Sequence, residues 1–198
     1  MKLNWGERLA VNNPLRVVQQ GFEVRWFKQR ARVPEGLRVL EIGCGRGAGA
    51  ELLLREFRPR ELHATDLDLE MLRRAEVYMD PAALARATLT VADAVRLPHR
   101  DEAFDVVFGF GVLHHIPDWR GALREVARVL KPGGLYCLEE LYPSLYQNAL
   151  TKHFLLHPTE DRFHGTDLRG ELPRTGLRLR DTFEVPRIGL LAVCERPR

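Results

Sequence analysis

The chain has 198 residues, a formal net charge of +3 at pH 7 and a hydrophobic share of 45%. This length is enough for one domain with a buried core, and the composition is ordinary for a globular protein. The weak and scattered positive charge argues against a nucleic-acid partner. No apolar run approaches the roughly 20 residues that a membrane-spanning helix needs.

Cysteine usage and the first residues bear on the cell compartment. Cys44, Cys137 and Cys194 are odd in number and far apart. No spacing among them suggests a zinc site or a disulfide framework, so we expect reduced thiols and no bound metal. Residues 1–7 contain no apolar stretch of the kind found in secretory signals. These features predict a cytoplasmic protein.

Hydrophobic periodicity predicts a helical segment over residues 4–32, followed by alternating strands and helices. Asn13-Pro14 is typical of a helix start, and Leu15, Val18, Phe22 and Trp26 are spaced to share one helix face. Strands are expected at 37–42, 61–66, 87–92, 103–108 and 134–139, and helices at 46–57, 68–79 and 118–130. This alternation predicts an α/β fold with a mostly parallel sheet and right-handed crossovers.

The last third of the chain has a different pattern. Pro132-Gly133-Gly134 predicts a tight turn into the fifth strand. A helical stretch at 143–157 and a polar loop at 158–175 follow. Two strand-like runs, 177–185 and 188–195, are then expected to form an antiparallel hairpin.

The strand that ends in Glu41-Ile42 runs into a glycine-rich turn, Gly43-Cys44-Gly45-Arg46-Gly47. Glycine lacks Cβ, so such a turn can press its backbone against a ligand at the carboxyl end of the sheet. Asp66 lies 66 − 47 = 19 residues past Gly47, where an acid suits a ribose, although it could instead cap the next helix. The loop also fits the GxGxxA pattern of dinucleotide sites, so it leaves the cofactor open. Glu41 beneath it favours a cationic amine over phosphates.

Four further motifs follow along the chain. Asp93 ends the third strand, and Phe104-Asp105-Val106-Val107 lies in the fourth. Leu113-His114-His115-Ile116 follows the fourth strand, and Leu130-Lys131-Pro132-Gly133-Gly134 closes the helix before the fifth. Together with Glu41 and the glycine loop, this order resembles the class I S-adenosylmethionine-dependent methyltransferases. The branch is the small-molecule one (type 11) that includes quinone-biosynthesis enzymes. The resemblance covers about residues 37–141.

This resemblance implies a fold and a reaction. The fold would be a Rossmann-like, seven-stranded sheet of order 3-2-1-4-5-7-6, with strand 7 antiparallel and helices on both faces. A small-molecule acceptor would attack the sulfonium methyl of S-adenosyl-L-methionine in line, leaving S-adenosyl-L-homocysteine. Orientation alone can supply several kcal/mol to such a transfer, so no obligatory catalytic side chain is needed. The protein would be a monomer or a homodimer.

The resemblance also implies roles for single residues. Glu41 would hold the methionine amino group, and Asp66 would bind both ribose hydroxyls. Asp93 would accept hydrogen bonds from the adenine amine. Gly43, Cys44 and Gly45 would offer backbone atoms to the methionine and ribose portions of the cofactor. Leu67 would flank the adenine, and the Ala94 amide would lie near it. Phe110 would present a backbone carbonyl near the methionine.

Two groups of side chains are candidates for the acceptor side. His114 and His115 follow the fourth strand, where a neutral imidazole can accept a proton near pH 7. The simpler alternative is that they only pack at the turn and hydrogen-bond to backbone there. Aromatic and histidine side chains between strands five and six would line an acceptor pocket or pack a helix onto the sheet. They are Tyr142, Tyr146, His153, Phe154, His157, Phe163 and His164. Trp5, Phe22, Trp26 and Phe27 would form a lid or, more simply, core.

Two alternatives stay open: an NAD-type oxidoreductase using the GxGxxA loop, and a non-catalytic partner subunit that binds S-adenosylmethionine. Glu41 and Asp93 argue against the first. Gly109-Phe110-Gly111-Val112 stands after the fourth strand, in place of an Asp/Asn-Pro-Pro-Tyr/Phe motif, and this argues against methylation of an exocyclic base amine or a glutamine amide. We expect one domain: a helical cap (1–33), a cofactor-binding core (34–141), a substrate-side segment (142–175) and a hairpin (176–198).

Overall fold

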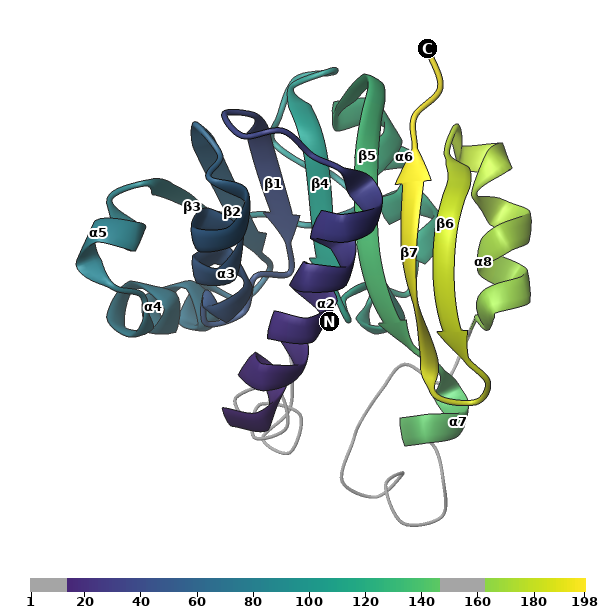
Figure 1. Cartoon of the computed structure of the whole chain (residues 1–198), viewed down its shortest axis with the longest axis horizontal. Coiled ribbons are helices and arrows are strands. Elements are labelled where there is room, and N and C mark those ends of the chain that lie inside the picture. Colours follow the sequence, from purple (N-terminus) through teal and green to yellow (C-terminus); the bar gives the residue numbers. More distant parts are fainter. Residues whose placement is uncertain (1–13, 147–162) are drawn as a thin grey trace.

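A seven-stranded sheet of order β3-β2-β1-β4-β5-β7-β6 organises the protein (Figure 1). The computed structural model describes residues 14–146 and 163–198. The strands are β1 (Arg38–Ile42), β2 (Glu61–Asp66), β3 (Ala87–Val91), β4 (Phe104–Phe110), β5 (Leu130–Leu141), β6 (Arg178–Val185) and β7 (Gly189–Glu195). β7 is antiparallel to both of its neighbours, and β1 to β5 are parallel. The predicted order and the antiparallel strand are confirmed.

The register brings the carboxyl ends of the parallel strands to one edge of the sheet. Ile42 at the end of β1 is aligned with Thr65 of β2 and with Gly109 of β4. Phe110, the last residue of β4, is aligned with Glu139 of β5. The loops that follow these strands therefore meet, and a site can form there.

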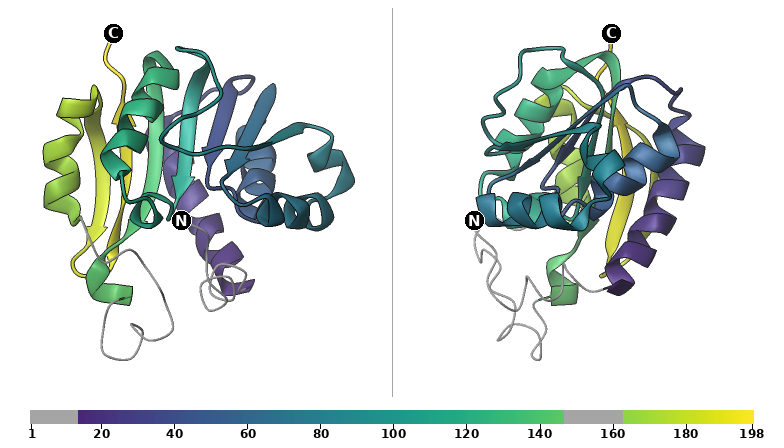
Figure 2. Two further views of the ribbon diagram at one scale, coloured as in Figure 1. Left: turned by 180° about the vertical axis from the view of Figure 1, so that it is seen from behind. Right: turned by 90° about the vertical axis from the view of Figure 1, so that its left-hand side faces the viewer.

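Helices cover both faces of the sheet (Figure 2). The described ones are α2 (Pro14–Ala31), α3 (Ala48–Phe57), α4 (Leu69–Tyr78), α5 (Pro81–Leu84), α6 (Trp119–Val129), α7 (Pro143–Tyr146) and α8 (Gly165–Glu171), with 3-10 turns η1 (Leu113–His115) and η2 (Pro173–Thr175). Helices α2 and α3 lie on one face, and α6 and α8 lie on the other (Figures 1 and 2). Asp68 and Asp118 cap α4 and α6 by accepting hydrogen bonds from the backbone.

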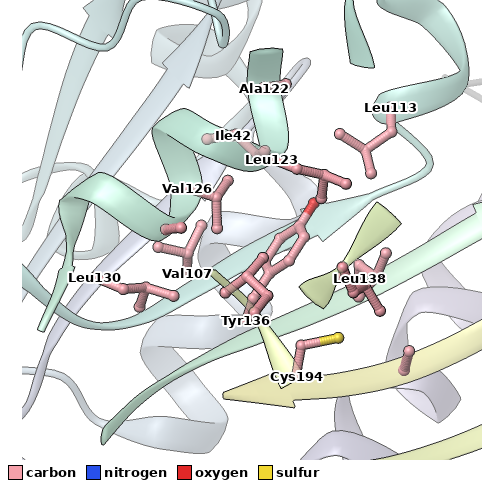
Figure 3. Close-up of a cluster of buried hydrophobic side chains, with 14 of the residues drawn as sticks. Ile42, Val107, Leu113, Ala122, Leu123, Val126, Leu130, Tyr136, Leu138 and Cys194 are labelled. Carbon is pink, nitrogen blue, oxygen red and sulfur yellow. The ribbon is translucent and has the colours of Figure 1, made fainter. Parts of the chain in front are cut away.

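Each face has its own hydrophobic layer. On the α6 face the ring of Tyr136 is completely buried among Val107, Leu123 and Val126 (Figure 3). On the α2 face Phe108 contacts both Phe27 and Phe57, with ring centroids 6.1 Å and 5.0 Å apart. Burial of these rings, together with the aliphatic side chains of the two clusters, stabilises the packing of the helices on the sheet.

The buried face of α2 differs from the predicted one. Val18 and Phe22 are 58% and 66% exposed, so the expected stripe does not face the core. The buried side chains of this helix are Gln20, Glu23, Val24, Phe27 and Ala31. The helix is rotated relative to this prediction because an ion pair between Arg16 and Glu139 holds its inner face against β5. Of the aromatic residues expected in the core here, Phe27 is buried and Trp26 is partly buried; Trp5 lies outside the described residues.

The prediction of a polar loop at 158–175 is also wrong in part, because residues 165–171 form α8 and residues 173–175 form η2. The Asp167 carboxylate accepts a hydrogen bond from the His164 amide, 2.8 Å away, at the start of α8. Leu168 and Leu172 are buried one helical turn apart. That i, i+4 pair is a short helix signal within a polar segment.

The predicted helix at 143–157 is described only over α7, and residues 147–162 lie outside the described part. Within residues 14–146 and 163–198, no helix has the length and apolar character needed to cross a membrane.

Candidate active site

The glycine-rich turn joins β1 to α3 in a left-handed conformation that glycine favours. Gly43 and Gly47 have φ angles of 68° and 86°. A Cβ on Gly43 would overlap the side chain of Val112, which follows β4. The Cys44 amide donates to the Thr65 carbonyl, 2.9 Å away, and so ties the turn to β2. The backbone here comes close to its neighbours, as the glycines predict.

Glu41 lies beneath this turn and is 1% exposed. Its Oε2 has no hydrogen-bond partner among the described residues. Burial, and then the nearby charge of Asp66, raise the pKa of Glu41 to about 8. A Cβ on Gly49 would overlap Glu41 Oε1, so the glycine at this point of α3 makes room for the carboxylate. A buried carboxyl group in this state suits a hydrogen-bonding, positively charged ligand group.

Asp66, at the end of β2, organises the neighbouring part of the edge. Its two carboxylate oxygens accept hydrogen bonds from the amides of Gly45 and Asp68, at 2.9 Å and 2.8 Å. Burial raises its pKa, and these hydrogen bonds oppose the rise. Asp68 is the residue that caps α4, so Asp66 is not needed as the cap. Leu67, beside it, is 41% exposed.

Asp93 and Ala94 follow β3 next to Asp66. The Ala92 amide donates to the Asp66 carbonyl, 2.9 Å away, which joins the two strand ends. Asp93 is exposed, and its Oδ1 accepts a hydrogen bond from the Val95 amide at 3.1 Å. We call this part of the edge, with the ends of β1, β2 and β3, the glycine-loop half.

The other part of the edge is formed by β4, β5 and η1, and its central residue was not predicted. Glu140 on β5 is fully buried. Its carboxylate accepts hydrogen bonds from the amides of Val112, Leu113 and His114, at 3.1, 2.8 and 3.2 Å. The Nδ1 atom of His114 lies 2.8 Å from Glu140 Oε2. Glu140 therefore fixes the turn that carries the histidine pair.

The histidines predicted as candidates are brought together at this turn. The rings of His114 and His115 lie 4.2 Å apart, and His114 is buried. Phe110, just before the turn, is also buried, and the Gly111 amide donates to the Glu139 carbonyl at 2.8 Å. The catalytic role of His114 and His115 stays a prediction.

A second unpredicted group links helix α2 to β5. Arg16 Nη1 lies 2.8 Å from Glu23 Oε1, and Arg16 Nη2 lies 2.6 Å from Glu139 Oε2. Gln19 also donates to Glu23 Oε1, at 2.8 Å. The only sequence signal was a pair of glutamates ending an apolar strand, and it named no partner. We call the ends of β4 and β5, with η1 and the inner side of α2, the paired-glutamate half.

The aromatic segment between β5 and β6 is only partly described. Tyr142 and Phe163 are buried, and the ring of Phe163 packs against Trp119 with centroids 4.6 Å apart. The Tyr142 hydroxyl donates to Glu184. These two side chains pack in the core, while His164 is exposed. His153, Phe154 and His157 lie outside the described residues, as does the side chain of Tyr146.

A family model for the methyltransferase domain matches residues 40–138. The chain belongs to this family. It is a member of the class I S-adenosylmethionine-dependent methyltransferases, type 11 branch. The predicted family is thereby confirmed, and the family is one that uses S-adenosylmethionine rather than NAD.

Individual relatives agree with the family. A demethylmenaquinone methyltransferase of Listeria welshimeri is 36% identical over 136 residues, covering 65% of this chain and 57% of that protein. A fatty-acid O-methyltransferase of Mycolicibacterium smegmatis is 38% identical over 109 residues, covering 55% of this chain and 39% of that protein. The chain thus spans about half the length, or less, of these curated relatives.

The fold has close counterparts among solved structures. A S-adenosylmethionine-dependent methyltransferase from Aquifex aeolicus superposes with a TM-score of 0.78 at 17% identity, covering 98% of this chain and 100% of that one. At this identity the match shows the fold alone.

Proposed function

We propose that this protein transfers a methyl group from S-adenosyl-L-methionine to a small-molecule acceptor. The observation that carries the proposal is Glu41: a buried carboxyl group with an unpartnered oxygen beneath a close-packed glycine turn. The ammonium of a methionine group would stabilise the ionised form of Glu41, so the carboxyl group would release its proton on binding, whereas a phosphate-bearing cofactor would repel that form. When bound, the cofactor supplies a methyl carbon attached to positively charged sulfur.

The glycine-loop half would hold this cofactor. Glu41 would bind its amino group, and Asp66 would accept hydrogen bonds from both ribose hydroxyls. Asp93 would accept from the adenine amine, and Leu67 would flank the ring. The remaining backbone contacts would come from Gly43, Cys44, Gly45, Ala94 and Phe110.

Positioning supplies most of the rate under this proposal. The residues after β4 would face the transferred methyl group, and an acceptor held about 3 Å from that group would gain several kcal/mol from orientation. His114 and His115 are candidates to orient the acceptor or take its proton. Residues 1–33 and 142–175 would select the acceptor, and residues 34–141 would bind the cofactor.

A small, hydroxylated or quinone-related acceptor is the class that the relatives suggest. One relative is named for a demethylated menaquinone and another for a fatty acid. Demethylmenaquinone and a fatty acid are both apolar molecules with an oxygen function, and this supports an acceptor of that kind.

Calorimetry on the purified chain tests the cofactor part of the proposal. We expect micromolar binding of S-adenosyl-L-homocysteine and no binding of NADH. The reverse result would overturn the proposal and restore the oxidoreductase alternative. Methyl transfer by the isolated chain then separates an enzyme from a non-catalytic partner subunit.

A further inference from the structure

The ion-paired glutamates of the paired-glutamate half have two oxygens that the structure leaves unused. Arg16 engages one oxygen of Glu23 and one of Glu139. The other two, Glu23 Oε2 and Glu139 Oε1, are buried and have no hydrogen-bond partner among the described residues. The two side chains are only 6% and 4% exposed. Burying carboxylate oxygens without a partner costs free energy, and a ligand that binds them would remove that cost.

Their position places them at the acceptor end of the site. A Cβ on Gly111, directly after β4, would lie 3.1 Å from Glu139 Oε2 and 3.4 Å from the His114 ring. Arg16 Nη2 would lie 3.6 Å from the same Cβ, so these three side chains close around Gly111 and leave no room for a side chain there. On the same face of the sheet, Glu139 is aligned with Phe110, and a Cβ on Gly49 would come within 3.2 Å of the Phe110 ring and overlap Glu41 Oε1. The row Glu41, Phe110, Glu139 therefore runs from the proposed cofactor site to the glutamate pair.

We propose that Glu139, held together with Glu23 by Arg16, accepts at its unpartnered Oε1 the proton from the hydroxyl group of a phenol-like acceptor. This inference rests on the proposed methyl transfer. A neutral phenol can enter the buried site without losing the hydration of a charge, which a carboxylate would have to lose. An ammonium group would be attracted to the two acids, but it has no free electron pair with which to attack the methyl group. A carboxylate would in addition meet a cluster of two acids and one arginine.

The proton and electron movements balance within the site. The acceptor O–H bond breaks, its proton passes to the Glu139 carboxylate, and the electron pair remains on the acceptor. The acceptor then bonds to the methyl carbon while the methyl–sulfur bond breaks, and that electron pair stays on sulfur as a neutral thioether. The proton later leaves Glu139 for water.

The charges around the pair suit a base that works near neutral pH. Burial, and then the charge of Glu139, raise the pKa of Glu23 to about 7, while Arg16 opposes the rise. Burial raises the pKa of Glu139 as well, with Arg16 opposing and Glu140 adding to it. The charged and titratable groups around the pair are Arg16 on α2, which binds both glutamates, Glu140 on β5, whose charge acts on Glu139, and His114 on η1, whose ring lies beside Gly111. Glu41 on β1 lies further along the same face, beyond Phe110. A general base is most effective when its pKa lies near the working pH.

The first experiment asks for the acceptor class with the wild-type chain and S-adenosyl-L-methionine. The probes are 1-naphthol, 1,4-dihydroxynaphthalene, palmitate and phenethylamine. We expect methylation of one or both hydroxylated compounds and of neither other probe. If the chain binds S-adenosyl-L-homocysteine yet methylates neither hydroxylated compound, the inference is overturned while the proposed function can still hold. If it binds no S-adenosyl-L-homocysteine, the proposed function itself has failed.

The second experiment tests Glu139 directly. Glu139→Gln should leave the affinity for S-adenosyl-L-homocysteine within about twofold and lower kcat by at least about a hundredfold, the usual effect of losing a general base. Glu139→Asp should recover part of the turnover although it fits the space less well. Glu125→Gln is the matched control, because Glu125 is also paired with an arginine, Arg128, but lies on α6 across the sheet. A Glu139→Gln variant with turnover within threefold of wild type would contradict the inference.

The pH dependence separates proton transfer from a merely structural role, and it also serves if Glu139→Gln does not fold. In the wild type kcat should rise with pH through neutrality as the pair loses its proton. Glu23→Gln removes a like charge beside Glu139, so the pKa of Glu139 falls and this rise should move to lower pH. An unchanged profile in Glu23→Gln would count against the pair as the proton acceptor.

Discussion

The two halves of the carboxyl edge are built in different ways. In the glycine-loop half the key residues come directly after strands, and hydrogen bonds tie each loop to its neighbouring strand. In the paired-glutamate half the key contact joins Arg16 to Glu139, which are 123 residues apart. The first half is therefore encoded in short motifs, whereas the second depends on how a helix docks. Substitutions in the two halves should accordingly damage different properties.

The largest expected effect is on stability, in the paired-glutamate half. Glu140→Ala removes a buried carboxylate that three backbone amides and His114 share. We expect the free energy of unfolding to fall by about 3–5 kcal/mol, because those buried donors lose their partner. Urea denaturation measures this. The control is Glu102→Ala, whose exposed pair with Arg196 should contribute less than about 1 kcal/mol. Equal losses in both variants would mean that Glu140 does not organise this half.

The glycine-loop half should show the opposite sign for its buried acid. The folded-state pKa of Glu41, about 8, lies above its ordinary value of 4.5, so the folded protein binds the proton more tightly. The resulting stability is present below about pH 4.5 and is lost as pH rises toward 8. Glu41→Gln avoids this loss and should stabilise the protein at pH 9 by roughly 2–4 kcal/mol, with little difference at pH 4.

The same variant should lose function, which calorimetry would detect. We expect Glu41→Gln to bind S-adenosyl-L-homocysteine at least about tenfold more weakly at pH 9, because a charge-assisted hydrogen bond is gone. Wild-type affinity should fall as the pH drops from 8 to 6, since Glu41 must then release a proton on binding. A Gln variant that is both less stable at pH 9 and unchanged in affinity would refute the assignment.

Asp66→Ala comes next in size and should affect binding more than folding. We expect at least about a tenfold loss of affinity for S-adenosyl-L-homocysteine, because two hydroxyl hydrogen bonds to a carboxylate would disappear. Since Asp66 also accepts from the Gly45 and Asp68 amides, a modest loss of stability should accompany it. Unchanged affinity would remove Asp66 from the ribose site.

Asp93→Ala should have the smallest effect. Asp93 is exposed and accepts one local hydrogen bond, so the thermal midpoint should barely change. Affinity should fall less than in Asp66→Ala, and discrimination between adenosine- and inosine-containing ligands should weaken. Discrimination equal to wild type would exclude Asp93 as the residue that reads adenine.

The same contrast explains what could be predicted from the sequence. The sheet order came from a family resemblance over residues 37–141, and strand periodicity located six of the seven strands to within two residues. The exception is β5, which begins at Leu130, four residues before the predicted start, so Pro132-Gly133-Gly134 lies within the strand and is not a turn before it. Glu41 and Asp66 could be predicted because they stand next to recognisable turns. Glu139 and Glu140 could not, because their partners come from α2, from η1 and from backbone amides that no local sequence pattern indicates. The predicted apolar face of α2 was wrong for the same reason: the long-range ion pair, together with Val24 and Phe27, sets the rotation of the helix.

The insertion of β7 between β5 and β6 has a consequence for folding during synthesis. β5 pairs on one side with β4 and on the other with residues 189–195. While the ribosome is still making those residues, the outer edge of β5 has no strand beside it, and β6 cannot yet be joined to the sheet. The glycine-loop half can form on the nascent chain, whereas the strand that carries Glu139 gains its second neighbour only after residue 195 has emerged.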